Sequence, residues 1–302
     1  MIWIVVAVLL LLVLLVFTGR YFFLFTFKRW DKDYEWTDDT APVVMIRDWD
    51  YFHRADRQAV EVESFDGLKL RGWFYDQGGK TTILFCHGYQ GGPEELSGIA
   101  GRMAARGYNA LLIYERAHSL SEGEYFTMGY RERLDIVKWI DCINARKPGG
   151  KVVLYGWSMG GASVMAALGE KLPENVVCAV EDCGYENLFD QLEHSTTLML
   201  PKLPFRHFFT SVLSAYCRLF KGFPVRYPLS RGLENNRVPV LFIHGTADEL
   251  VPYENLDKVY SACGSKKLRS SYMGAAHISS FGREPERYIA EMSAFIREYA
   301  GE

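Results

Sequence analysis

The N-terminal stretch of the chain is apolar without interruption. From Ile2 to Phe17 the sequence reads IWIVVAVLLLLVLLVF, and Thr18 and Gly19 extend it to 18 residues, or about 27 Å of helix. That length crosses a bilayer core, whereas a core helix of a soluble domain would show a polar face. The stretch has neither the charged start nor the small-residue cleavage site of a signal peptide. The pattern predicts an uncleaved transmembrane anchor over residues 1–27.

The charges beside this stretch predict its orientation. The basic residues that flank it all lie on its C-terminal side: Arg20, Lys28, Arg29 and Lys32. By the positive-inside rule, this bias keeps the rest of the chain in the cytoplasm. We therefore expect a single-pass membrane protein whose folded domain is cytoplasmic.

After a polar connector at residues 28–58, strand-like and helix-like segments alternate. Ala59–Ser64 and Leu68–Tyr75 flank Phe65-Asp66-Gly67 and predict a hairpin. Short apolar runs typical of buried parallel strands follow at Thr81–Cys86, Ala110–Tyr114, Val152–Tyr155, Val176–Val180, Val238–Ile243 and Leu268–Met273. Helix-like stretches lie between or after them at Glu94–Arg106, Tyr130–Ala145, Met159–Lys171, Tyr253–Cys263 and Glu284–Tyr299. This alternation predicts a doubly wound α/β sheet with helices on both faces.

The composition is that of a globular protein, and the net charge and the cysteine pattern give no indication of nucleic-acid or metal binding. Of the 302 residues, 49% are hydrophobic and 24% charged, which excludes a mainly disordered, collagen-like or coiled-coil chain. The formal net charge of −3 provides no basic field for nucleic acid. The cysteines, at positions 86, 142, 178, 183, 217 and 263, form no C-x-x-C pair and no Cys/His pattern. We expect buried, unpaired thiols, which suit a reducing compartment, and no metal site or disulfide scaffold.

A candidate nucleophile follows one of the buried strands. Gly156-Trp157-Ser158-Met159-Gly160 comes after the run Lys151–Tyr155 and opens a helix-like stretch, which is the strand–turn–helix context of a nucleophile elbow. The flanking glycines allow a tight turn that lifts the Ser158 hydroxyl out of the sheet. The alternative is a glycine turn that only packs a helix against the sheet.

A serine hydroxyl needs a general base that is held by an acid. Asp248, in His244-Gly245-Thr246-Ala247-Asp248, lies just past one strand, and His277 lies past the last strand. The order Ser, Asp, His is that of α/β-hydrolases. Alternatively, Asp248 caps the following helix and His277 is an ordinary loop residue. Asp182, at the end of another strand, is the reserve candidate for the acid.

The tetrahedral intermediate needs backbone N–H donors as an oxyanion hole. Cys86-His87-Gly88-Tyr89-Gln90-Gly91-Gly92 follows the strand Thr81–Cys86, and we assign one donor to the Tyr89 N–H. The second is the Met159 N–H, next to the nucleophile. His87 is expected to brace this loop, because it lies on the wrong strand to be the base.

The motifs around these candidate residues resemble those of a known superfamily. From Val60 to the C-terminus it resembles the α/β-hydrolases, in the group near serine aminopeptidases and monoacylglycerol lipases. Besides G-W-S-M-G-G, H-G-Y-Q-G and H-G-T-A-D, the resemblance rests on Glu115–Gly123, which is similar to an R-x-H-G-x-S-x-G loop, and on Phe126–Gly129, Glu132–Asp135 and Trp139. Ser119 stands where that loop usually has Gly, which bears on the local turn and not on the triad. The resemblance implies hydrolysis of esters, thioesters or amides.

The segment from about Tyr185 to Leu233 is too long for a simple connection. In the fold that the resemblance implies, such an insertion forms a cap over the active site. From His194 to Leu233 it has no Asp or Glu, and aromatic residues interleave with the basic Lys202, Arg206, Arg218, Lys221, Arg226 and Arg231. This character suits contact with an anionic membrane surface, or equally an acyl pocket with solvated charges outside. Both favour a hydrophobic substrate, and we hypothesise that the cap faces the bilayer.

These features together predict an α/β-hydrolase fold: a mostly parallel doubly wound sheet with a small helical cap, preceded by one transmembrane helix. The expected domains are the anchor at 1–27, the connector at 28–58 and the hydrolase domain at 59–302, with the cap at about 185–233. The expected function is a membrane-anchored serine esterase that acts on an acyl substrate without cofactor or metal, with membrane lipid as a partner. A peptidase or amidase, an acyltransferase on the same triad and a non-catalytic tethered binding module remain alternatives.

Overall fold

The computed structural model describes residues 1–29 and 47–301. The chain divides into two compact units. The smaller consists of Met1–Lys28 and Asn187–Pro228, and the larger of Arg29–Glu186 and Leu229–Glu302. The N-terminal helix thus shares a unit with the long insertion, although the two lie far apart in the sequence.

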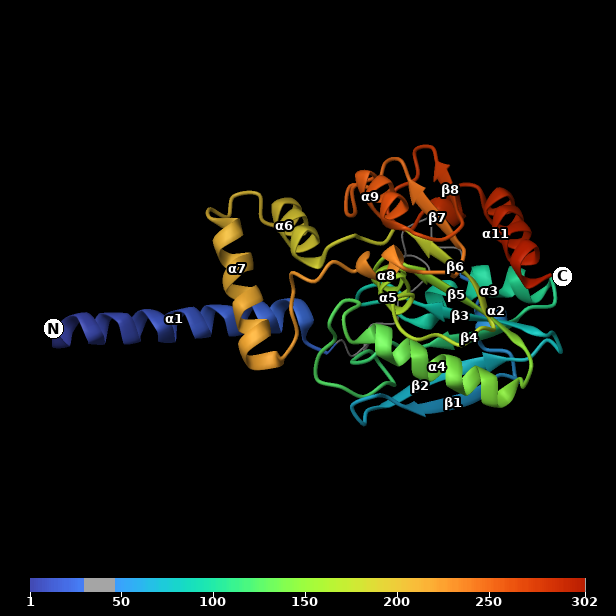
Figure 1. The fold of residues 1–302 in the computed structure, drawn as a ribbon, viewed down its shortest axis with the longest axis horizontal. Coiled ribbons are helices and arrows are strands. Elements are labelled where there is room, and N and C mark those ends of the chain that lie inside the picture. The colour runs from blue at the N-terminus through green and yellow to red at the C-terminus, as the bar shows by residue number, and fades with distance from the viewer. Residues whose placement is uncertain (30–46, 302) are drawn as a thin grey trace. The chain divides into compact units, whose positions relative to one another are not determined.

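The larger unit is built on one eight-stranded sheet in the order β1-β2-β4-β3-β5-β6-β7-β8 (Figure 1). The strands are β1 (Gln58–Glu63), β2 (Lys69–Tyr75), β3 (Thr81–Cys86), β4 (Asn109–Ile113), β5 (Lys151–Trp157), β6 (Val176–Asp182), β7 (Val240–Gly245) and β8 (Lys267–Tyr272). The β1–β2 hairpin is antiparallel, and β2 also runs antiparallel to β4. From β4 through β8 all neighbouring strands are parallel. The predicted hairpin and the mostly parallel sheet are confirmed.

Helices cover both faces of this sheet, as the alternation predicts. The helices that pack into the core on one face are α3 (Ser97–Ala104), α10 (Ser280–Arg283) and α11 (Pro285–Ala300). On the other face lie α4 (Glu132–Arg146), α5 (Met159–Ala167), α8 (Arg231–Glu234) and α9 (Glu254–Ala262). Two short elements complete the unit, α2 (Trp49–Phe52) and the 3₁₀ turn η1 (Pro93–Leu96). Because consecutive strand residues point to opposite faces, the apolar runs within these strands contribute to both layers of the core.

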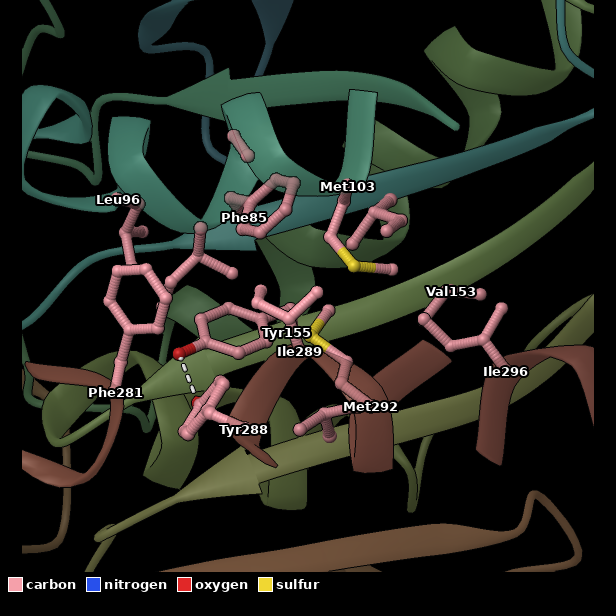
Figure 2. Packing of buried hydrophobic residues seen from close by; sticks show 14 of the residues in the cluster. Phe85, Leu96, Met103, Val153, Tyr155, Phe281, Tyr288, Ile289, Met292 and Ile296 are labelled. Atoms are coloured by element: carbon pink, nitrogen blue, oxygen red, sulfur yellow. Dashed lines mark hydrogen bonds between the residues drawn. The ribbon is translucent and has the colours of Figure 1, made fainter. Parts of the chain in front are cut away.

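The core beneath α11 carries a polar pair inside an apolar cluster (Figure 2). Tyr155 of β5 and Tyr288 of α11 are fully buried, and their hydroxyl oxygens are 2.8 Å apart. Ile289 and Met292 pack around them. This pair links the strand that leads to Ser158 with the C-terminal helix.

The smaller unit consists of α1 (Ile2–Phe27), α6 (Leu188–Met199) and α7 (Arg206–Tyr216), followed by the π-helical turn η2 (Cys217–Lys221). Among the described residues, α1 is the one helix long and apolar enough to cross a membrane. Its first two thirds are exposed, whereas Gly19, Phe23 and Phe27 are buried against its own unit. A position for this insertion over the active site stays a prediction.

Candidate active site

Ser158 lies in the turn between β5 and α5, with the backbone strain expected of a nucleophile elbow. Its φ of +53° and ψ of −120° put a residue with a side chain in a conformation that usually requires glycine. The two flanking glycines are sterically required. A Cβ on Gly156 would overlap the backbone of Gly160, and a Cβ on Gly160 would overlap the carbonyl of Cys86. The G-x-S-x-G pattern therefore reflects the close approach of three backbone segments.

Two backbone hydrogen bonds hold this turn. The Ser158 N–H donates to the carbonyl oxygen of Asp182 at 2.8 Å, which ties the turn to the end of β6. The Ser158 carbonyl accepts from the Ala162 N–H at 3.0 Å, which closes the first turn of α5. The serine thus sits at a helix N-terminus, where the helix dipole favours negative charge.

The three residues predicted as the triad form one chain of hydrogen bonds. His277 Nε2 lies 2.8 Å from Ser158 Oγ, and His277 Nδ1 lies 2.7 Å from Asp248 Oδ2. An ionised carboxylate only accepts hydrogen bonds, so Nδ1 carries the imidazole proton in this pair. Nε2 is then the acceptor that faces the Ser158 hydroxyl. The imidazole is therefore oriented to remove the serine proton.

Asp248 is held as a buried anion. Its Oδ1 accepts from the N–H groups of Leu250 at 3.0 Å and Val251 at 2.8 Å, which leaves Oδ2 for His277. Burial alone raises the pKa of Asp248, but hydrogen bonds from His244 and His277 outweigh it and hold the pKa at about 2. The carboxylate is consequently charged at neutral pH and rigidly aimed at the imidazole.

His244, the first residue of the H-G-T-A-D motif, has a role in the site that was not predicted from the sequence. It is buried at the end of β7, with Nε2 2.9 Å from the Val251 carbonyl oxygen and 3.4 Å from Asp248 Oδ2. Because the Val251 carbonyl can only accept, Nε2 carries the proton. His244 therefore fixes the turn that presents Asp248, and the H-G-T-A-D motif was the signal for it.

Asp182, the reserve acid, is placed differently. Its carboxylate is buried and accepts from the Tyr288 hydroxyl at 2.7 Å. Burial raises the pKa of Asp182 to about 6, although the Tyr288 hydrogen bond partly offsets it. His277 Nδ1 donates its hydrogen bond to Asp248 and not to Asp182.

The predicted oxyanion-hole residues both lie next to Ser158. Met159 is the first residue of α5. Tyr89 follows Gly88, where an added Cβ would lie 3.4 Å from Ser158 Cβ, so this loop passes directly beside the nucleophile. The structure thus places both residues at the site, and the donor role of their N–H groups stays a prediction.

His87 braces the loop, as predicted. It is fully buried, its Nε2 accepts from the Glu115 N–H at 3.0 Å, and its Nδ1 lies 2.8 Å from the Gly88 carbonyl oxygen. Since Nε2 accepts, Nδ1 holds the proton and donates to Gly88. The predicted brace is confirmed, and it ties the loop of Tyr89 to the segment after β4.

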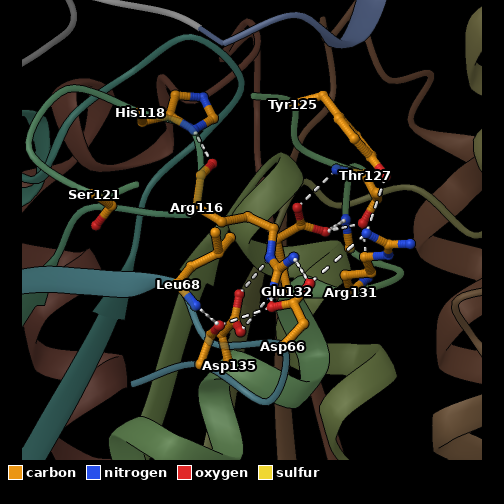
Figure 3. Close-up of polar contacts among 12 residues, drawn as sticks. Asp66, Leu68, Arg116, His118, Ser121, Tyr125, Thr127, Arg131, Glu132 and Asp135 are labelled. Carbon is orange, nitrogen blue, oxygen red and sulfur yellow. Dashed lines mark hydrogen bonds and ion pairs between the residues drawn. The ribbon is translucent and has the colours of Figure 1, made fainter. Parts of the chain in front are cut away.

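A buried charge network stabilises that segment (Figure 3). The Arg116 guanidinium is 1% exposed and pairs with Asp135 at 2.6 Å and Asp66 at 3.0 Å. Next to this group in the sequence, the Glu132 carboxylate accepts from the backbone N–H and the hydroxyl of Thr127, both at 2.7 Å. Apart from Asp66 of the β1–β2 turn, these residues belong to the segments that carried the resemblance, and the structure gives them a scaffolding role.

Ring contacts connect this network to the oxyanion loop. His118 packs edge-on against His87 with ring centroids 4.9 Å apart, and it also contacts Phe126 at 4.6 Å. The ring of Tyr89 in turn lies against Phe126 at 5.5 Å. The segment after β4 therefore packs against the Tyr89 ring through Phe126.

Ser119, the departure from the loop pattern, keeps the turn that glycine would make. Its φ is +42°, in the left-handed region, where a residue with a Cβ costs about 1–2 kcal/mol. Arg29 compensates by donating through its guanidinium to the carbonyl oxygens of Ser119 and Ser121. The turn that Ser119 put in question is thus formed.

Cys183, Asp248 and His277 have ligand-type atoms within 4.8 Å of one another. The carboxylate and imidazole in this group are already hydrogen-bonded at 2.7 Å, which leaves no space for an ion between them. The Cys183 thiol is buried, and burial raises its pKa well above the usual value, so it stays protonated. This arrangement fits a triad with a neutral neighbour better than a metal centre.

Comparisons with known proteins agree with this fold. The protein YfhR of Escherichia coli O157:H7 is 22% identical over 253 residues, covering 79% of this chain and 80% of YfhR. The esterase Pf2001 of Pyrococcus furiosus matches with a TM-score of 0.65 at 22% identity, over 81% of this chain and 92% of its own. The acylaminoacyl peptidase of Pyrococcus horikoshii matches with a TM-score of 0.59 at 18% identity, over 81% of this chain and 42% of its own. The predicted α/β-hydrolase fold is confirmed.

Residues 115–302 match the prolyl oligopeptidase family. The match spans more than half of the chain and includes Ser158, Asp248 and His277. The α/β-hydrolase superfamily expected from the motifs is thereby confirmed, and the chain is a serine hydrolase that belongs to the prolyl oligopeptidase family.

Proposed function

We propose that the chain is a membrane-anchored esterase that cleaves a hydrophobic acyl ester through an acyl-enzyme on Ser158. The observation that carries the proposal is the continuous hydrogen-bonded chain from Asp248 through His277 to Ser158. A serine with no base is not nucleophilic at neutral pH, and this chain supplies both the base and its orientation.

The reaction follows from the atoms that face one another. His277 Nε2 removes the Ser158 hydroxyl proton as Oγ attacks the ester carbonyl carbon. The N–H groups of Tyr89 and Met159 hold the oxyanion, and Asp248 stabilises the imidazolium. His277 then protonates the leaving alcohol, and a water molecule activated by the same imidazole releases the acid.

The proposal of a membrane anchor is based on the difference between the two parts of α1. From Ile2 to Phe17 the side chains are apolar and, except for the half-buried Leu15, exposed, which is unlike a buried core helix. In the last third, the face that carries Phe23 and Phe27 is buried inside its own unit. Removal of the helix as a signal sequence would strip this packing, which supports an uncleaved anchor. The basic flank and the six free cysteines support a cytoplasmic catalytic domain.

Amide cleavage is the second candidate, because the matching family is named for peptidases and one of the similar structures is an acylaminoacyl peptidase. Matched p-nitrophenyl esters and p-nitroanilides of the same acyl groups separate the two. We expect full-length chain in detergent micelles to hydrolyse the esters, with a preference for medium over short acyl chains. Higher kcat/KM on the anilides would make the peptidase assignment the correct one.

The variant Ser158→Ala controls for background hydrolysis, and Ser163→Ala is its matched control. Ser163 is a buried serine on the same helix that donates only to the Met159 carbonyl at 2.8 Å. Loss of ester hydrolysis in Ser158→Ala alone is the expected result. Equal turnover in both variants would assign the hydrolysis to a different group, and no turnover in the folded wild type would favour a tethered binding module.

A further inference from the structure

The last third of α1 is a structural helix of the insertion. A Cβ on Gly19 would lie 2.7 Å from Tyr216 Cβ, so glycine is what lets α1 and α7 approach this closely. Beyond it, Phe23 lies 5.7 Å from the Tyr216 ring and is 2% exposed. Phe27 is fully buried, 5.3 Å from the ring of Phe223. The anchor helix therefore completes the core of the smaller unit.

The residues of α1 that pack on the insertion begin directly after its membrane-spanning part, so the insertion lies at the membrane surface and not in bulk water. From Ile2 to Thr18 the helix is about 25 Å long, while a bilayer core is about 30 Å thick. If Ile2–Thr18 spans the hydrocarbon core, Gly19 lies at the boundary between that core and the headgroups. Since α7 is packed on Gly19, the same boundary passes through the insertion.

The outer surface of the insertion is apolar where this boundary would lie. Five large side chains of α6, α7, their connection and η2 are more than half exposed: Met199 at 64%, Phe205 at 79%, Phe208 at 51%, Leu219 at 75% and Phe220 at 55%. We refer to these five residues as the interfacial surface. Basic residues accompany them in the sequence, with Lys202 and Arg206 beside Phe205 and Arg218 beside Leu219, and no acidic residue occurs from His194 to Leu233.

We propose that the interfacial surface inserts into the anionic headgroup region of the bilayer that α1 spans. The inference rests on the anchor of the proposed function and adds the lipid contact of the insertion. A lipid surface, and not a partner protein, is the occupant for two reasons. Buried contacts connect the insertion that carries this surface to the anchor helix, and the lysine and arginine residues from His194 to Leu233 have no acidic residue among them in the sequence. Aromatic and leucine side chains with lysine and arginine are the composition that enters this zone.

Fluorescence of an environment-sensitive label tests this in the full-length chain. The label NBD is attached to Leu219→Cys, and in a second protein to Leu268→Cys, both in a Cys142→Ser background because the other native cysteines are buried. Leu268 is the matched control, since it is a 51% exposed leucine on β8 of the larger unit. The proteins are reconstituted into phosphatidylcholine vesicles with one quarter phosphatidylglycerol, and doxyl lipids serve as quenchers.

We expect the label at position 219 to emit at shorter wavelength and to be quenched several-fold more than the label at position 268. Neutral vesicles, or Arg218→Gln and Lys202→Gln together, should reduce the difference. Equal, water-like emission at both positions would overturn the proposal.

Carbonate extraction of the same vesicles separates this outcome from failure of the anchor. Protein that resists carbonate but carries a water-exposed label at position 219 refutes the interfacial surface alone. Protein that carbonate releases refutes the anchor, and the lipid contact with it.

Discussion

Replacement of Asp248 by asparagine is the sharpest test of the site's electrostatics. The change keeps the shape and lets the asparagine oxygen accept from Leu250 and Val251, as Asp248 Oδ1 does. The asparagine NH₂ group then faces His277 Nδ1 and forces that nitrogen to accept. Nε2 becomes the protonated nitrogen and can no longer take the proton of Ser158. We expect kcat to fall by about 10⁴-fold, the size of this substitution in a serine protease triad.

The same variant has a stability consequence that can be worked from the pKa of Asp248. A fall from 3.8 to about 2 corresponds to about 2.5 kcal/mol of stabilisation of the folded charged form. Because the folded pKa is depressed, this contribution is complete above the unfolded pKa near 4 and is lost as the pH falls toward 2. Asp248→Asn should therefore be less stable by about 2 kcal/mol at pH 7, with a difference that shrinks below pH 4.

The assays are ester hydrolysis and denaturant unfolding of the full chain in micelles, at pH 7 and at pH 3. The comparison variant is Asp182→Asn, which keeps an acceptor for the Tyr288 hydroxyl and should retain most of the activity. The reverse result, an inactive Asp182→Asn and an active Asp248→Asn, would make Asp182 the triad acid and refute the assignment.

Three further substitutions test the packing. Gly160→Ala places a methyl group against the Cys86 carbonyl, so we expect the variant to lose activity and at least about 1–3 kcal/mol of stability. Thermal unfolding and ester hydrolysis measure the two effects. A variant with native stability and activity would contradict the close approach of the two backbones. Arg116→Met removes the guanidinium partner of Asp135, whose pKa burial already raises to about 7, and so leaves an unpaired buried carboxyl group. Unfolding in denaturant should be easier by about 1–3 kcal/mol, and adding Asp135→Leu should restore much of the loss. Gly19→Leu pushes α1 away from Tyr216, so we expect faster proteolysis within residues 187–228. The protein should still resist extraction from the membrane by carbonate. Proteolysis at the wild-type rate would mean that α1 does not support the insertion.

The strands and the order of the triad residues were predictable because their signals are local. The run Thr81–Cys86 is buried at every position because both faces of β3 are covered, and it was predicted at its observed bounds. The helix predicted over Met159–Lys171 ends earlier, at Ala167. Gly169 there approaches the backbone of Gly232, a contact between segments distant in sequence that the local pattern does not contain.

The roles of individual residues within the site depend on tertiary contacts, so the sequence predicted them less well. Asp182 and Asp248 both follow strands, and only the hydrogen bonds of Tyr288 and His277 distinguish them. His244 was visible in its motif, but its contact with Val251 depends on the turn after β7. The packing of Gly19 on Tyr216 joins positions nearly two hundred residues apart, and the apolar pattern of α1 gave no sign of it.

Covalent labelling of the full-length chain tests whether Ser158 is an activated nucleophile. The full-length chain is treated with a fluorophosphonate probe, and the labelled residue is identified by peptide mass spectrometry. We expect one adduct on Ser158, which is absent in Ser158→Ala and forms much more slowly in Asp248→Asn. A well-folded wild type that takes up no probe, or an adduct on a different serine, would contradict it.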